Sequence, residues 1–147
     1  MKFVKENSDK GVYIPCSLMK LSGFAEAEKL SVLPFPKAVL TMPGTLTAID
    51  MLTLLTSLRL AEQDLIDSLF DACESDEPGQ RFGDEVYLLY ALGHLSKDVS
   101  EAFSLLGEAT AEEAEDCAGA LLDELHERGL NMVGLFEHML EGDNVYE

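Results

Sequence analysis

The sequence predicts an α+β fold in which a short β-rich segment precedes about five amphipathic helices. Two changes near Thr45 support this prediction. Before it, apolar residues alternate over short runs broken by proline and glycine, and after it they recur with the helical period. Residues 1–44 hold six basic and four acidic residues, a net charge of +2, whereas residues 45–147 hold four basic and 24 acidic residues, a net charge of −20. We therefore expect two domains, 1–44 and 45–147.

The composition predicts a folded, soluble protein. The chain has 147 residues, a net charge of −18 and 47% hydrophobic residues, too many for a disordered acidic tail. No apolar run approaches the roughly 20 residues that span a bilayer, and no signal-peptide pattern follows the first lysines, so a cytoplasmic protein is expected. Cys16, Cys73 and Cys117 form no CxxC pair, which indicates free thiols, each most simply a buried structural residue.

The first 44 residues predict short elements in a fixed order. A β-type run ends at a proline, a short helix stops at a glycine, and two strands flank a rigid turn with two prolines. These elements are residues 11–15, 18–23, 30–33 and 37–40, with the turn at 34–36. The two strands are expected to form a hairpin.

Residues 45–147 predict helices. Residues 47–74 read as one long helix or as two with a joint near Arg59, and a polar linker follows at 74–82. The remaining boundaries come from caps and glycine stops: a helix from 84, a short one from Ser96, one at 111–128 opened by the capping box at 110–113, and one from Asn131 to Gly142.

Burial in the last two helices follows from their periodicity. One face is apolar and most acidic residues lie off it. We expect burial of Leu121, Leu122, Leu125, Val133, Phe136 and Leu140. We expect exposure of Glu112, Glu113, Glu115, Asp116 and Glu127. If the apolar face packs within the chain, this part is a folded bundle; if it stays open, it is a docking surface.

The order and spacing in the N-terminal segment resemble those of a known family. The matching stretches are residues 9–15, Leu18, residues 21–24, residues 28–32 and residues 37–40. This pattern is similar to the swapped-hairpin domain of AbrB-like and MazE-like proteins, which include bacterial transcription regulators and antitoxins. The resemblance implies a homodimer in which two chains interlace their strands into one barrel. The implied dimer core is Val12, Ile14, Leu18, Leu30, Val32, Val39 and Leu40.

The same resemblance implies a non-enzymatic regulator with DNA as a ligand, contacted by Lys5, Lys10 and Lys20. Phosphate contacts require basic side chains. However, no arginine precedes Arg59, and the charge of −20 on the helical part repels the DNA phosphates. The alternative is therefore an acidic protein-interaction module, antitoxin-like or an adaptor, that binds a basic protein and not DNA.

Catalytic and metal-binding patterns are weak. His94, His126 and His138 form no HExxH motif and no pair four residues apart, so surface or capping roles are the simpler interpretation. The sequence has no GxSxG motif and no glycine-rich phosphate loop. We expect no enzyme activity, no cofactor and no metal site.

Overall fold

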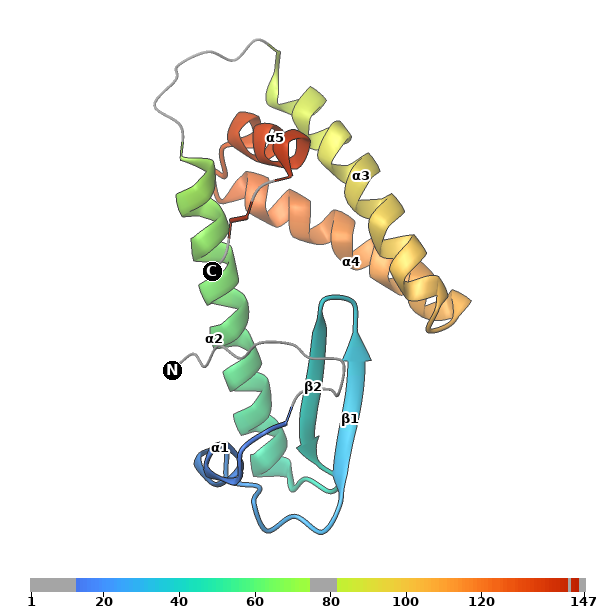
Figure 1. Cartoon of the computed structure of the whole chain (residues 1–147). Helices are drawn as coiled ribbons and strands as arrows, with labels where there is room; N and C mark the ends of the chain where they lie inside the picture. The colour runs from blue at the N-terminus through green and yellow to red at the C-terminus, as the bar shows by residue number, and fades with distance from the viewer. Residues whose placement is uncertain (1–12, 75–81, 143, 146–147) are drawn as a thin grey trace. The chain divides into compact units, whose positions relative to one another are not determined.

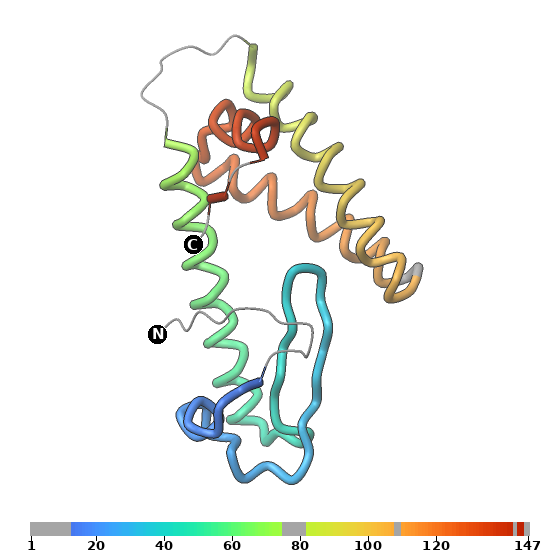
Figure 2. The backbone as a smooth tube through the Cα atoms, viewed as in Figure 1, coloured from blue at the N-terminus to red at the C-terminus, as the bar shows by residue number. Residues whose placement is uncertain are grey.

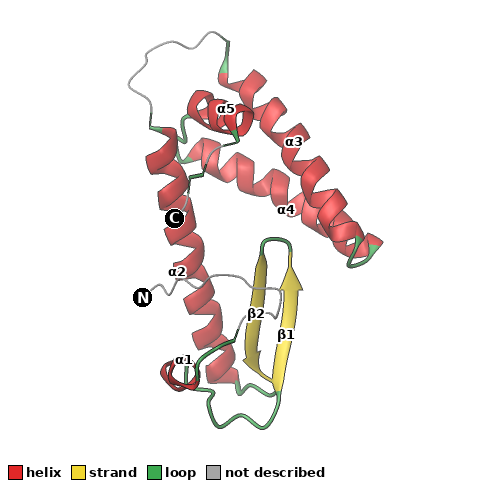
Figure 3. Cartoon of the chain, viewed as in Figure 1, coloured by secondary structure: helices red, strands yellow, loops and turns green. Residues whose placement is uncertain are grey.

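A computed structural model describes residues 13–74, 82–142 and 144–145 (Figure 1). Within these ranges the fold is mixed and mostly helical, with five helices and a two-stranded antiparallel sheet (Figure 3). The elements in order are α1 Cys16–Leu21, β1 Leu30–Phe35, β2 Ala38–Pro43, α2 Ala48–Cys73, α3 Asp84–Ser104, α4 Glu108–Glu127 and α5 Met132–Glu141. The chain divides into two compact units, Met1–Ile49 and Asp50–Glu147, which are called the hairpin unit and the helical unit.

The predicted glycine lies just past the end of α1, after the C-terminal cap residue Ser22. Gly23 has φ of +77°, the left-handed conformation that glycine adopts without steric cost. Its N–H donates to the Lys20 carbonyl and the Phe24 N–H donates to the Met19 carbonyl, each with an N···O distance of 3.1 Å. This pair of hydrogen bonds is the Schellman motif, and it satisfies the carbonyls that the helix end leaves free.

The predicted hairpin is present, but its turn lies later than predicted. The register pairs Phe35 with Ala38, so the two-residue turn is Pro36-Lys37, and Pro34 lies inside β1 opposite Val39. A proline is tolerated there because each strand of a two-stranded sheet has one unpaired edge. Lys37 has φ of +64°, and a proline followed by a positive-φ residue is typical of a type II turn.

The predicted first strand is not found in its described part. Residues 11 and 12 lie outside the described residues, and residues 13–15 belong to no strand. Pro15 instead serves as the N-terminal cap of α1, with extended backbone angles.

Helix α2 is one continuous helix, which decides between the two predicted alternatives. Two predicted boundaries are wrong: α3 passes through Ser96 to Ser104, and the next helix starts earlier than predicted. Helix α4 begins at Glu108, so Thr110 lies within its first turn and does not cap it. Gly107, with φ of +138°, ends the preceding turn and occupies the cap position. The predicted linker falls largely on residues 75–81, outside the described residues.

The turn between α4 and α5 matches the prediction. Gly129 has φ of +89°, and the Leu130 N–H donates to the Leu125 carbonyl at 3.0 Å, which closes a second Schellman motif. The Asn131 side chain accepts hydrogen bonds from the N–H groups of Val133 and Gly134, both at 3.1 Å, and caps α5. Gly142 ends α5 in the left-handed conformation.

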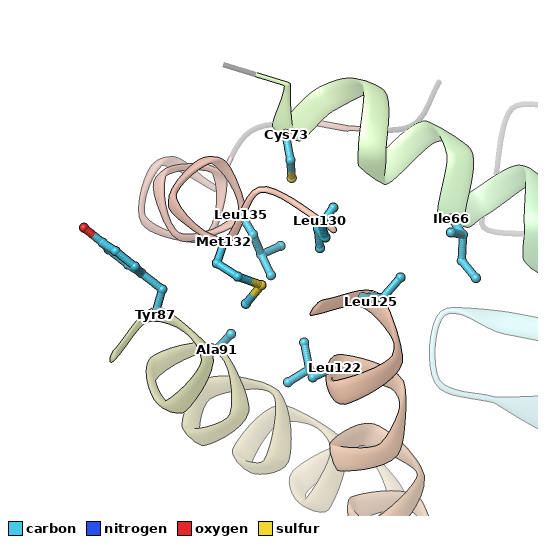
Figure 4. Packing of buried hydrophobic residues seen from close by; sticks show 9 residues of the cluster. All are labelled: Ile66, Cys73, Tyr87, Ala91, Leu122, Leu125, Leu130, Met132 and Leu135. Atoms are coloured by element: carbon cyan, nitrogen blue, oxygen red, sulfur yellow. The ribbon is translucent and has the colours of Figure 1, made fainter. Parts of the chain in front are cut away.

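The core of the helical unit is contributed by all four of its helices and by the turn before α5. Figure 4 shows Leu122, Leu125, Leu130, Met132 and Leu135 gathered between the helices, with the Tyr87 ring turned away from them. Its buried members are Ile66, Cys73, Tyr87, Ala91, Leu122, Leu125, Leu130, Met132 and Leu135. Phe136 packs edge-on against Tyr87 and Tyr90, with ring centroids 5.2 and 4.6 Å apart. The helical unit is therefore a folded bundle.

Burial in α4 and α5 agrees with the prediction for the acidic residues and in part for the six apolar residues. Leu122 and Leu125 are buried, Val133 and Phe136 are half-buried against the core, and the five acidic residues named above are exposed. Leu121 and Leu140 are 37% and 59% exposed, so their predicted burial is wrong. Neighbouring helical residues point about 100° apart, so Leu121 is turned away when Leu122 faces the core.

The end of α2 contacts α5 directly through backbone. A Cβ at Gly134 would clash with the Cys73 carbonyl oxygen, so only glycine permits this approach. The His138 Nε2 lies 2.7 Å from the Ala72 carbonyl oxygen, and the Arg128 guanidinium lies over the Phe70 ring, 5.6 Å from its centroid. Cys73 is buried at this contact, as predicted, whereas Cys16 and Cys117 are exposed, contrary to the prediction.

Replacement of Gly23 by valine should lower the free energy of unfolding of the hairpin unit by more than about 1 kcal/mol, because a β-branched residue is strained at positive φ. Gly23→Asn is the control. Asparagine tolerates the left-handed region, so this variant should lower the free energy of unfolding by less. Hydrogen exchange of the hairpin amides in the full chain measures both variants. Equal protection in wild type and Gly23→Val would contradict the role of this cap.

Replacement of Gly134 by alanine should lower the free energy of unfolding of the helical unit by more than about 1 kcal/mol, because the new methyl group forces α5 away from α2. The control is Gly93→Ala in α3, where a Cβ meets no atom within 4 Å. Gly93→Ala should raise the free energy of unfolding of the helical unit by about 0.5–1 kcal/mol, because alanine is a better helix former than glycine. Opposite signs in urea denaturation are expected; stabilisation by both variants would exclude a tight contact.

Candidate interaction surface

The hairpin is apolar on both of its faces. Side chains alternate between the two faces of a strand, and directly paired residues share a face. From the register, one face carries Leu30, Val32, Pro34, Val39, Thr41 and Pro43, and the other carries Ser31, Leu33, Phe35, Ala38, Leu40 and Met42. Most soluble hairpins with one buried face show polar residues on the other. This hairpin has the pattern of one that is covered on both sides.

The structure does not bring the predicted dimer-core residues onto one surface. Leu30, Val32 and Val39 share one face of the hairpin, whereas Leu40 lies on the other. Val32 and Val39 are 58% and 66% exposed. The other described members are Ile14, which is exposed before α1, and Leu18, which is half-buried in α1. Val12 lies outside the described residues.

Two apolar residues of the second face were missed by the sequence analysis. Leu33 and Phe35 are exposed and lie on the same face as Leu40. Phe35 was missed because the turn was predicted at residues 34–36, which ended the strand at Leu33; Leu33 lay in the predicted strand but was not assigned to the dimer core. The sequence pattern that could have found them is the spacing of two residues, which places Ser31, Leu33 and Phe35 on one face of an extended strand.

The lysines predicted to contact DNA are only partly described. Lys20 is exposed in the last turn of α1, and Lys5 and Lys10 lie outside the described residues. Lys29 and Lys37 are also exposed in this unit, one at the start and one at the tip of the hairpin. The described acidic residues of residues 13–49 are Glu26 and Glu28, so this part of the chain is slightly basic.

A shallow hollow of about 370 Å³ lies at the open end of the hairpin. Its lining residues are Ala27, Glu28, Lys29, Pro43, Gly44 and Thr45. The Gly44 N–H donates to the Lys29 carbonyl at 2.8 Å, and a Cβ at Gly44 would lie only 3.2 Å from that oxygen. The hydrogen bond closes the base of the hairpin beside this hollow.

The three histidines have separate environments. His94 stacks on Tyr90 with ring centroids 4.4 Å apart, and the His126 Nε2 lies 3.8 Å from an Asp84 carboxylate oxygen. His138 faces the Ala72 carbonyl. Within the described ranges, no three His, Cys, Asp or Glu side chains are grouped so that they could hold a metal ion.

The helical unit presents acidic side chains with few basic neighbours. Its sequence holds 24 acidic residues and four basic ones. Arg128 pairs with Glu124 within one helix turn at 3.6 Å. The acidic residues of α4 named above remain exposed, so this unit can attract a basic partner and repels an anionic one.

None of the helices that the structure describes combines the length and the hydropathy needed to cross a membrane. Comparison of the chain with protein-family models, with curated proteins and with solved structures finds no match.

Proposed function

We propose that this protein is a non-enzymatic regulator that works as a homodimer joined through the hairpin unit, with DNA as its ligand. The proposal resembles the mode of action of AbrB-like transcription factors. It is carried by one observation: the two-stranded hairpin has apolar side chains on both faces, and each face has large exposed ones, Leu30, Val32 and Val39 on one and Leu33 and Phe35 on the other.

Physical chemistry favours a shared core for this unit. A lone two-stranded hairpin is at best marginally stable in water, and a unit of fewer than 50 residues rarely closes a core of its own. Each square ångström of apolar surface that a second copy covers contributes about 25 cal/mol. Interlacing two hairpins covers both faces of each at once, which a one-sided contact does not achieve.

The DNA ligand is supported by the charge of the same segment. Residues 1–44 are the only basic part of the chain, and a dimer doubles the number of lysines presented. Lys20 is exposed at the end of α1 and is free to reach a phosphate. The acidic helical unit opposes binding at long range, so the expected affinity is modest and falls steeply with salt.

A second candidate function is an acidic protein-interaction module that does not bind DNA. The exposed acidic residues of α4 and the charge of −20 on the helical unit favour it, because they suit a basic protein surface. Retrieval of a basic protein on the immobilised full chain, lost at high salt, would support this candidate if DNA is not bound.

The dimer is tested by Val32→Glu, which places a carboxylate on one hairpin face. Burying an ionised carboxylate is costly, so the dimer should weaken at least tenfold, about 1.4 kcal/mol. The control is Val86→Glu in α3, because Val86 is exposed to a similar extent but lies in the helical unit. Sedimentation equilibrium at micromolar concentration measures both. A monomeric wild-type protein, or equal effects of the two variants, would refute the proposal.

DNA binding is tested by fluorescence anisotropy with a random duplex at low salt. Lys20→Ala should weaken binding and reduce the slope of log K against log salt by about 2 per dimer, because each copy loses one phosphate contact. Lys97→Ala, an exposed lysine of α3, is the control and should leave the slope unchanged. Absence of binding at the lowest salt would exclude DNA and leave the protein-interaction candidate.

A further inference from the structure

The first four turns of α2 expose a continuous apolar face. Helix α2 joins the core only through its last turns, at Ile66 and Cys73. Figure 2 shows the helix extending away from that contact within the helical unit. Before it, apolar residues recur with a spacing of three and four: Met51, Leu54, Leu55, Leu58, Ala61 and Leu65. We call these six residues the α2 stripe; all are exposed except Leu54, which is half-buried.

The spacing of the α2 stripe is that of a coiled-coil seam. Met51, Leu58 and Leu65 are seven residues apart and take the first position of the heptad, called a, while Leu54 and Ala61 take the fourth, called d. Leu55 widens the seam by one position. Thr56 and Gln63 lie on the opposite side of the helix, so the side away from the seam is more polar.

The distribution of charge favours α2 of a second copy as the partner that covers the α2 stripe. Residues 48–61 hold one acidic and one basic residue, Asp50 and Arg59, and are neutral. Residues 62–147 hold 23 acidic and three basic residues, so contact between copies there meets strong repulsion. Within the helical unit, the start of α2 is therefore where two copies repel each other least; Leu65 lies just past this neutral stretch, beside Glu62 and Asp64.

Parallel pairing also avoids like-charge contacts at the flanks of the seam. In a parallel two-helix coil each residue of the flanking position g faces a residue five further along in the partner helix. Asp50 would face Leu55, Ser57 would face Glu62, and Asp64 would face Leu69. No pair of acidic residues is opposed, although the helix has five.

We propose that the α2 stripe pairs with the α2 stripe of a second copy, parallel and in register. The parallel direction rests on the proposed hairpin dimer: residues 44–47 alone join β2 to α2, and so short a connection holds the two helix starts within about 20 Å of the shared hairpins. Two heptads are too short to associate alone. The seam therefore adds to the affinity of the hairpin dimer and does not replace it.

The matched variants are Leu58→Glu, on the seam, and Leu60→Glu, off the seam. Both residues are exposed leucines in the same stretch of the same helix, at 42% and 69%. Leu58→Glu should weaken the dimer at least tenfold in sedimentation equilibrium, and Leu60→Glu should leave it unchanged. Equal effects of the two substitutions, or no effect of Leu58→Glu, overturn the proposal. So does a monomeric wild type whose melting temperature falls with Leu58→Glu, because the stripe is then covered within one chain.

Cross-linking tests the alignment. In full-length protein with Cys16 and Cys117 changed to serine, Met51→Cys and Leu65→Cys should each form a disulfide with the same residue of the second copy under mild oxidation. Thr56→Cys, on the opposite side, is the control and should not. An antiparallel pair would leave both seam cysteines unlinked to their equivalents, and that result overturns the proposal.

Val32→Glu separates this inference from the proposed function. Loss of the dimer with Val32→Glu but not with Leu58→Glu refutes the seam and leaves the hairpin dimer standing. Loss with Leu58→Glu but not with Val32→Glu refutes the hairpin dimer. Weakening by both, with Leu60→Glu and Val86→Glu unchanged, is the expected result.

Discussion

The place of α2 in the helical unit depends on one close approach, that of the Cys73 backbone to Gly134. Because residue 134 has no side chain, the end of α2 lies against the first turn of α5 backbone to backbone. That contact buries Cys73 and brings Ile66 into the same core as Leu125. Without it α3, α4 and α5 would still pack together, but α2 would lose its place in the core. The His138 ring at the Ala72 carbonyl reinforces the contact one helix turn further along α5.

Local rules predicted those parts of the fold that depend on local chemistry. The glycine stops at Gly23 and Gly129 and the cap at Asn131 need only the conformational freedom of glycine and the reach of an asparagine side chain, and both can be read from a few residues. The hairpin followed from alternation. Wrong boundaries arose where a local signal competed with a longer pattern: Ser96 resembles a cap, yet the apolar face of α3 continues past it.

Tertiary contacts were not predictable in this way. Leu121 and Leu122 are equally apolar, and only the position of α3 decides which of them is buried. The need for glycine at position 134 appears only once α2 lies against it. The candidate interaction surface was predicted in part, because the strand residues were identified but their division between two faces required the register, which shifts with the turn at Pro36-Lys37.

The segments that pack together in the core lie far apart in the sequence, and this affects how the chain folds during its synthesis on the ribosome. The core pairs Ile66 and Cys73 with residues 122–135, so it joins parts of the chain that are made far apart in time. At about 5–20 residues per second, α2 is complete several seconds before α5 exists to receive it. During that interval the whole apolar side of α2 is uncovered, and its residues 48–61 carry no net charge. Neighbouring ribosomes on one messenger would present such helices to one another before either bundle can close.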